Sequence, residues 1–328
     1  MNIDMIRAAQ SRLAGRVRYT PLLSSPFLDD LAGRRVWVKA ECLQHTGSFK
    51  YRGALSAISA LDPDERRRGV IAYSSGNHAQ GVALAARQAR SPAVIIMPAD
   101  APRVKIENTR ALGAEIVLYD RVAGEDRDAI GADIASKRNL MLIKPFDNAQ
   151  VIAGQGTTGL EIAEQARAEG IEKADVIVCC GGGGFASGIA LALAAEAPKM
   201  RVRPAEPENF DDMIRSLAAG ERLSNATTSG SICDAIISPT PGELTFPILQ
   251  RLAGTGFVVT DDEALHAMAL AFSHLKVVAE PGGAVALASA LFRRSEIEAD
   301  DVIVTISGGN VDADVFQLAL TRHAGTAT

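Results

Sequence analysis

Short apolar runs alternate with amphipathic segments along most of the chain. The apolar runs predict β-strands near residues 35–40, 70–73, 93–97, 115–118, 141–143, 175–180, 201–203, 256–259 and 301–306. The segments between them predict helices near residues 51–60, 78–90, 102–111, 125–137, 156–169, 185–196, 211–218, 243–253, 262–274 and 283–293. This alternation indicates βαβ units and mainly parallel sheets.

Two stretches, residues 70–111 and 175–218, repeat the same order of strand, glycine-containing turn, helix, strand and helix. The fold class is therefore α/β, and two open, mainly parallel sheets explain the pattern better than one large sheet. A chain of 328 residues is long enough for two domains. We expect a large discontinuous domain made of residues 1–50 and 151–328, with a small mobile α/β domain, residues 51–150, inserted between its halves.

The composition is that of a globular protein with a real core, with 47% hydrophobic and 22% charged residues. The net charge of −5 and the lack of a basic tract argue against a nucleic-acid partner. No apolar run approaches the roughly 18 residues that span a bilayer, and the N-terminus has no signal-peptide core, so we expect no membrane association. The four cysteines show neither zinc-site spacing nor the framework of a secreted disulfide-rich protein, so we expect a reducing cytoplasm.

Four consecutive glycines separate an apolar strand from a predicted helix. They are Gly181, Gly182, Gly183 and Gly184. Without side chains, successive backbone N–H groups can converge on an anion, and the helix N-terminus adds a favourable dipole. Residues 181–186 also match the G-x-G-x-x-A pattern of dinucleotide sites, with Glu206 roughly 20 residues further on. The loop predicts a phosphate site but leaves a nicotinamide cofactor open.

Two further polar glycine turns follow predicted strands. The sequence A-Y-S-S-G-N-H at 72–78 offers hydroxyls, an amide and backbone donors at a helix start, which can bind a carboxylate. The sequence T-I-S-G-G-N at 305–310 ends the last strand. Since ligands of open α/β sheets bind at the carboxyl ends of strands, the three turns predict one composite site. The alternative is that Ser307 is a plain turn residue and His78 an ordinary helix-start histidine.

Lys50 follows a Thr-Gly-Ser turn and precedes a predicted helix. Partial desolvation and a nearby helix N-terminus both lower the pKa of a lysine in such a setting. Schiff-base chemistry requires the neutral amine that results. A surface lysine at a helix start fits the same spacing, so the segment alone leaves both interpretations open.

Five motifs occur in the order found in one enzyme family. They are S-F-K-x-R-G at 48–53, S-S-G-N-H at 74–78, P-F-D-x-x-x-V-I-A-G-Q-G-T at 145–157, G-G-G-G at 181–184 and S-G-G-N at 307–310. In these motifs the chain resembles the fold-type II PLP-dependent enzymes, most closely the serine/threonine dehydratase and serine racemase group. The resemblance implies pyridoxal 5′-phosphate in the cleft between two domains, a small amino-acid substrate and a homodimer.

The resemblance also implies residue roles. Lys50 would hold the cofactor as a Schiff base and later move the Cα proton, and Ser75 would be able to return a proton on the opposite face. The cofactor would be bound by Phe49, Lys50, Asn77, Gly181, Gly182, Gly183, Gly184, Phe185 and Ser307. The substrate would be bound by Ser74, Ser75, Gly76, Asn77 and His78. A neutral hydroxyl at Ser307 would make the pyridine ring a weaker electron sink, which suits β-elimination.

The implied activity is that of an ammonia-lyase, which converts a small L-β-hydroxy amino acid of the serine or threonine type into a 2-oxo acid and ammonia. On the same fold, a serine or aspartate-type racemase and an L-threo-3-hydroxyaspartate ammonia-lyase are alternatives, and an NAD(P)-dependent oxidoreductase is a distant one. Residues 233–235 (Cys-Asp-Ala) and 280–283 (Glu-Pro-Gly-Gly) depart from the family pattern near the substrate pocket, so the preferred side chain stays open. Because few residues follow Ser307, we expect no C-terminal regulatory domain and a catabolic role.

The acidic stretch 205–212 resembles the divalent-metal loop of some members. Glu206 and Asp212 would supply carboxylates and Phe210 its carbonyl oxygen. Oxygen ligands fit Mg²⁺ or Ca²⁺. An ordinary acidic loop after a strand is the alternative.

Overall fold

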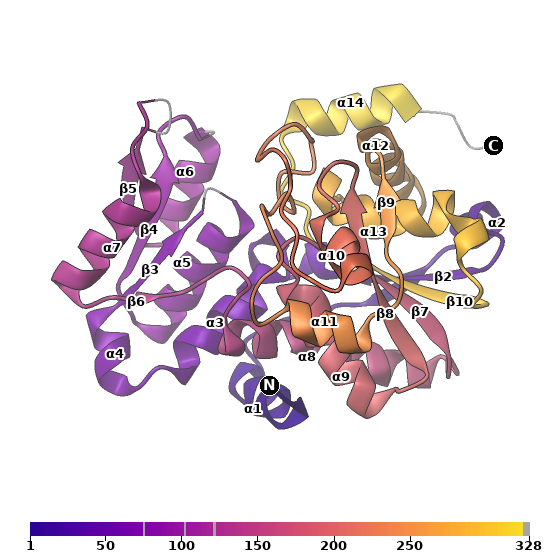
Figure 1. Ribbon diagram of the computed structural model, residues 1–328, viewed down its shortest axis with the longest axis horizontal. Helices are drawn as coiled ribbons and strands as arrows, with labels where there is room; N and C mark the ends of the chain where they lie inside the picture. The colour runs from indigo at the N-terminus through magenta and orange to yellow at the C-terminus, as the bar shows by residue number, and fades with distance from the viewer. Residues whose placement is uncertain (75, 102, 121–122, 324–328) are drawn as a thin grey trace.

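The computed structural model describes residues 1–74, 76–101, 103–120 and 123–323. Its strands form two open sheets (Figure 1). The six-stranded sheet has the order β1 (Leu22–Ser24), β2 (Arg35–Ala40), β10 (Asp301–Ile306), β7 (Ala174–Cys179), β8 (Met200–Pro207) and β9 (Phe257–Val259). The four-stranded sheet has the order β5 (Glu115–Tyr119), β4 (Ala93–Pro98), β3 (Val70–Tyr73) and β6 (Met141–Leu142). Neighbouring strands are parallel except β1 and β2, so the predicted α/β fold with two mainly parallel sheets is confirmed.

Helices lie against both faces of the sheets. They are α1 (Ile3–Leu13), α2 (Pro26–Ala32), α3 (Lys50–Ala60), α4 (Pro63–Arg68), α5 (Asn77–Ala89), α6 (Arg103–Ala111), α7 (Arg127–Arg138), α8 (Ala149–Ala168), α9 (Gly184–Glu196), α10 (Asp212–Ala219), α11 (Phe246–Leu252), α12 (Asp261–Leu270), α13 (Pro281–Phe292) and α14 (Ala313–His323). Short helical turns also occur at Glu41–Leu43, His45–Gly47, Ala271–Leu275 and Arg294–Glu296. None of the helices in the described part of the chain is both long and apolar enough to cross a bilayer.

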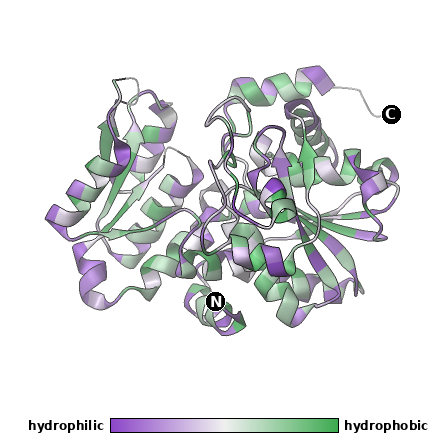
Figure 2. Ribbon diagram, viewed as in Figure 1, coloured by the Kyte–Doolittle hydropathy of each residue, from purple (hydrophilic) through white to green (hydrophobic). Residues whose placement is uncertain are grey.

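Alternate side chains of the central strands enter different cores. In the six-stranded sheet, Val302 and Val304 of β10 belong to the core that includes α12 and α13, whereas Ile303 belongs to the core that includes α8 and α9. Burial on both faces explains why these strands are apolar throughout. Figure 2 shows the hydrophobic strands inside both halves and hydrophilic residues on the outer helices.

The strands between Val70 and Leu142 all belong to the four-stranded sheet, and the strands before and after them form the six-stranded sheet. The four-stranded sheet therefore lies within an insertion in the chain (Figure 1). The exact domain boundaries at 50/51 and 150/151 stay predictions.

Most of the predicted elements occur within a few residues of their expected positions, with one large difference. Helix α8 begins at Ala149, whereas its predicted start is residue 156. The sequence patterns also missed β1 and the helices α1, α2 and α14.

Candidate active site

A cavity of about 330 Å³ lies between the two sheets. One wall carries Tyr73, Ser74 and Asn77, from the end of β3 and the start of α5. Lys50, at the start of α3, and Glu280, just before α13, also line it, and Glu280 accepts a hydrogen bond from Asn77. The cavity thus lies at the carboxyl end of β3 in the four-stranded sheet and next to residues that surround the six-stranded sheet. Open α/β folds bind ligands at the carboxyl ends of their strands.

Lys50 is the first residue of α3 and points its amine into this cavity. The turn before the helix holds Thr46 and Gly47 at φ angles of 60° and 72°. Lys50 Nζ donates a hydrogen bond of 3.3 Å to the carbonyl oxygen of Pro145. Burial lowers the pKa of Lys50 to about 8, although the charge of Glu280 opposes the shift. A neutral amine is therefore available close to neutral pH.

The four glycines lie at the junction of β7 and α9, as predicted: Gly184 is the first residue of α9, and Gly183 before it has a φ of 89° that favours glycine. A Cβ atom on Gly182 would come within 2.3 Å of the Phe146 ring. A smaller cavity borders this loop and shares Lys50 and Phe146 with the larger one. The backbone of the loop is therefore exposed to a space that continues to Lys50.

Gln155 of α8 lines the smaller cavity beside the glycines. Within the described residues, neither its Oε1 nor its Nε2 has a hydrogen-bond partner, although both are buried. A buried amide without a partner is costly, so this side chain is suited to a polar ligand. The motif at 145–157 contained Gln155, but sequence reasoning gave the residue no role.

Phe49 and Phe185 stack on each other, with ring centroids 4.0 Å apart, and both line the smaller cavity. Ser307 is buried directly behind them, because its carbonyl oxygen accepts a hydrogen bond of 3.1 Å from the Phe49 N–H. Cys179, which lines the same cavity, lies next to Ser307. The structure therefore brings the predicted residues Phe49, Phe185 and Ser307 together.

Three of the predicted substrate-binding residues line the larger cavity at the start of α5: Ser74, Gly76 and Asn77. His78 also lines it, but its Nε2 lies 2.8 Å from the carbonyl oxygen of Ile143. Burial and the nearby charge of Lys50 lower the pKa of His78 to about 3, so the ring is neutral and donates from Nε2. Ser75, predicted as both a catalytic and a binding residue, lies outside the described residues.

Known proteins resemble this chain over nearly its whole length. The family model described as pyridoxal-phosphate dependent enzyme matches residues 13–309. This chain belongs to that family. The family's cofactor therefore resolves the choice of phosphate ligand, and the nicotinamide alternative is dropped.

Relatives in this pyridoxal-phosphate family carry different activities. A serine racemase of Oryza sativa subsp. indica is 40% identical over 98% of this chain and 94% of its own length. An L-threo-3-hydroxyaspartate ammonia-lyase of a Pseudomonas species is 40% identical over 95% of this chain and 96% of its own length. The structure of maize serine racemase has a TM-score of 0.89 at 36% identity and covers 98% of this chain and 97% of that protein. The fold-type II assignment is confirmed, and the relatives include both racemases and ammonia-lyases.

The residues present fit pyridoxal phosphate. The glycine loop offers backbone N–H groups next to a helix N-terminus, and the buried amide of Gln155 faces the same cavity without a protein partner. Lys50 stands where this cavity meets the larger one. The phosphate end of the cofactor would thus be held by main chain and the aldehyde end by Lys50.

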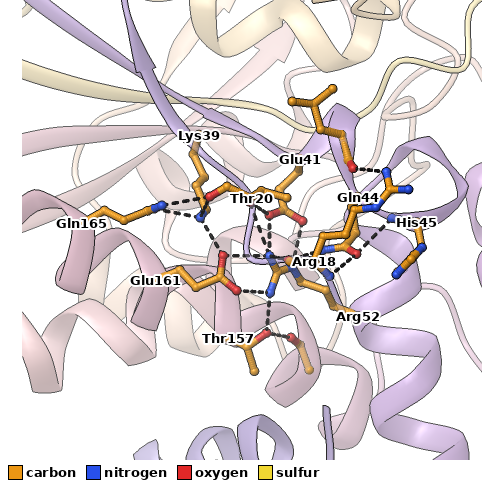
Figure 3. Close-up of polar contacts among 12 residues, drawn as sticks. Arg18, Thr20, Lys39, Glu41, Gln44, His45, Arg52, Thr157, Glu161 and Gln165 are labelled. Atoms are coloured by element: carbon orange, nitrogen blue, oxygen red, sulfur yellow. Dashed lines mark hydrogen bonds and ion pairs between the residues drawn. The ribbon is translucent and has the colours of Figure 1, made fainter. Parts of the chain in front are cut away.

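A buried ion cluster anchors the helix that begins with Lys50 (Figure 3). Arg52 has no exposed side-chain surface and donates to Glu41 at 2.8 Å and to Glu161 at 2.6 Å. Lys39 donates to Glu161 at 2.6 Å. The cluster joins the chain after β2, helix α3 and helix α8, which fixes the start of α3 relative to the cofactor loop.

The predicted metal residues lie together at the end of β8 and the start of α10. Glu206 accepts hydrogen bonds from the backbone N–H groups of Met213 and Ile214, and Asp212 Oδ1 accepts a side-chain hydrogen bond of 2.7 Å from Asn225 Nδ2. Asp212 Oδ2 is buried and has no hydrogen-bond partner among the described residues. Burial and the charge of Asp212 raise the pKa of Glu206 well above its ordinary value, and burial raises that of Asp212 to about 6. Two carboxyls in this state suit a shared cation or proton, although no group of three or more His, Cys, Asp or Glu in the described part forms a metal cluster.

Proposed function

We propose that this enzyme catalyses β-elimination from a small L-β-hydroxy amino acid and releases a 2-oxo acid and ammonia. The observation that carries this proposal is the amine of Lys50, which faces both cavities with a lowered pKa. A neutral amine in this position can take the proton from the substrate Cα. Bound pyridoxal phosphate supplies the electron-withdrawing ring that stabilises negative charge at that carbon.

The start of α5 would hold the substrate carboxylate. Its free backbone N–H groups, together with Ser74 and Asn77, face the cavity opposite Lys50. Because His78 is neutral, its contribution would be its backbone N–H and not a positive charge. Ser307, a neutral group proposed to bond the pyridine nitrogen, supports elimination over transamination.

Two cations of the inserted half, Lys105 of α6 and Arg127 of α7, also line the larger cavity. Neither lines the smaller cavity beside the glycine loop, so they would be available to a substrate side chain and not to the cofactor phosphate. A second carboxylate would gain charged hydrogen bonds there. We therefore propose that acidic β-hydroxy amino acids such as L-threo-3-hydroxyaspartate are preferred over serine and threonine.

Replacing Arg127 by alanine tests this preference. We expect kcat/KM for L-threo-3-hydroxyaspartate to fall about 10- to 100-fold, the loss of one charged hydrogen bond, while kcat/KM for L-serine changes much less. Keto-acid formation measures both. The control is Arg103→Ala, which removes a highly exposed arginine of the neighbouring helix α6. Equal losses with both substrates would contradict the proposal.

Racemisation is the second candidate, since the rice and maize relatives are serine racemases. The two activities differ in their product: elimination gives a 2-oxo acid, whereas racemisation gives the D-amino acid. Incubation with L-serine, L-threonine and L-threo-3-hydroxyaspartate, with chiral analysis and keto-acid detection, separates them. D-product without keto acid from every substrate would overturn the elimination proposal.

We also propose a Mg²⁺ or Ca²⁺ site formed by Glu206, Asp212 and the carbonyl oxygen of Phe210. Millimolar metal should stabilise the protein by about 2.7 kcal/mol at 100-fold excess over Kd, and a chelator should reverse this. Melting temperatures measure the effect. Asp212→Asn should melt at the same temperature with and without metal. A metal response that survives in Asp212→Asn would show that the ion binds elsewhere.

A further inference from the structure

Glu280 is a buried carboxyl group at the wall of the larger cavity, immediately before α13. Its backbone N–H donates to the Gly308 carbonyl oxygen at 3.0 Å. Two glycines make room for its side chain. A Cβ atom on Gly308 would overlap Glu280 Oε1, and one on Gly283 would lie 3.2 Å from its Cγ. Glycine at positions 283 and 308 thus leaves the space that the Glu280 carboxyl group occupies.

The carboxyl group is held by a directional chain of amides. Asn77 Nδ2 donates to Glu280 Oε1 at 2.6 Å, and Asn77 Oδ1 accepts from Asn310 Nδ2 at 2.7 Å. Asn310 Nδ2 also donates to the Thr46 carbonyl oxygen at 2.7 Å, so its amide cannot turn over without losing both bonds. The orientation of Asn77 is therefore fixed, and Glu280 must act as the acceptor.

Four titratable groups face Glu280 from the elements around it: Lys50 of α3, Lys105 of α6, Asp234 of the 233–235 loop and Cys42 of the 41–43 turn. Burial raises the pKa of the Cys42 thiol to about 12, so it is neutral, and Asp234 is exposed to solvent. Lys50 and Glu280 are thus a buried amine and a buried carboxyl group that line one cavity, and the charge of each acts on the other.

We propose that Glu280 is a positioning residue for a proton: its carboxylate, oriented by Asn77 and Asn310, keeps the Lys50 nitrogen protonated when that nitrogen is joined to the cofactor. The inference rests on the proposed role of Lys50 and goes beyond it. A protonated nitrogen makes the carbon bonded to it more open to attack by the incoming amino group of the substrate. Glu280 itself gives up no proton in this role.

The test uses the purified holoenzyme without substrate, so it does not depend on which amino acid the enzyme accepts. The visible absorbance band of the lysine-linked cofactor is recorded as the pH rises, and its loss reports deprotonation of the nitrogen. In Glu280→Gln, which keeps the acceptor for Asn77 and removes the charge, the midpoint should fall by about one pH unit, a tenfold lower proton affinity. Asp234→Asn, which neutralises an exposed carboxylate of the same cavity, is the matched control and should shift the midpoint much less.

A second measurement keeps the proposal testable if Glu280→Gln binds the cofactor poorly. Burial raises the pKa of Glu280 from its ordinary value of 4.5 to about 7, so the wild type should lose melting temperature as the pH rises from about 4.5 to 7 and change little from this group above that, whereas Glu280→Gln should lack this contribution. The proposal is overturned if the absorbance midpoint of Glu280→Gln equals that of the wild type or is matched by Asp234→Asn. It is also overturned if the two proteins lose melting temperature in parallel with pH.

Discussion

Replacing Lys50 by alanine will abolish the visible absorbance of the purified protein and lower turnover by at least roughly 10²- to 10⁴-fold. Loss of the proton-transferring amine alone accounts for a factor of this size, and loss of the covalent attachment adds to it. Absorbance spectra and keto-acid release measure the two effects separately. The absorbance and the turnover should be lost together, because the Lys50 nitrogen both holds the cofactor and transfers the proton.

Lys105→Ala is the matched control for this experiment. Lys105 lines the same cavity, yet it does not line the smaller cavity beside the glycine loop. Its replacement should leave the visible band in place. A Lys50→Ala protein that keeps a band removable by borohydride would show that another lysine holds the cofactor.

Replacing Arg52 by methionine should destabilise the folded protein by about 3–5 kcal/mol. The exchange keeps most of the side-chain volume but leaves Glu41 and one side of Glu161 buried without their cation (Figure 3). Burial opposes ionisation of Glu41, and it is Arg52 that holds the pKa of this carboxyl below its ordinary value. Denaturant unfolding measures the loss.

The control for Arg52 is Arg35→Met, which removes an ion pair to Asp301 from an arginine side chain that is 54% exposed. Exposed pairs of this kind contribute about 0–1 kcal/mol. Arg52→Lys should be intermediate, because an ammonium group cannot bridge two carboxylates as a guanidinium does. If Arg52→Met costs no more than Arg35→Met, the cluster does not stabilise the fold.

The strands were predictable because their signal is local. Runs such as V-I-V-T-I remain apolar whichever partner covers them, so β10 and β7 occur where their residues indicate. The strand β1 has three residues, which is too short for a pattern to emerge, and only its pairing with β2 defines it.

Helix α8 shows where local signals mislead. Its first half is rich in glycine, which has a low helix propensity and moved the predicted start to residue 156. The structure uses these glycines for close packing: a Cβ atom on Gly156 would lie 2.9 Å from the Gly188 carbonyl oxygen of α9. Tertiary contact therefore overrides propensity here. The N-cap Asn148 marks the true start, with its side chain accepting from Gln150 and Val151.

The residues of the candidate site also divide into those that a local pattern indicates and those that only folding brings together. Lys50 and the glycine loop belong to contiguous motifs, so the sequence was sufficient to select them. The partners of Arg52 come from positions 41 and 161, and those of Glu280 from 77 and 308. Such pairings exist only after folding. The charged Arg52 inside the motif at 48–53 was the one signal that could have drawn attention to its partners.

The contact between Lys50 and Pro145 lies where the chain leaves the six-stranded half and where it returns. A rotation of the inserted half about a line through these two crossings would hardly move Lys50. The same rotation would move Lys105 and Arg127, which belong to helices of the inserted half. Substitutions in α6 and α7 are therefore expected to change which amino acid is admitted more than they change the place of the reacting nitrogen.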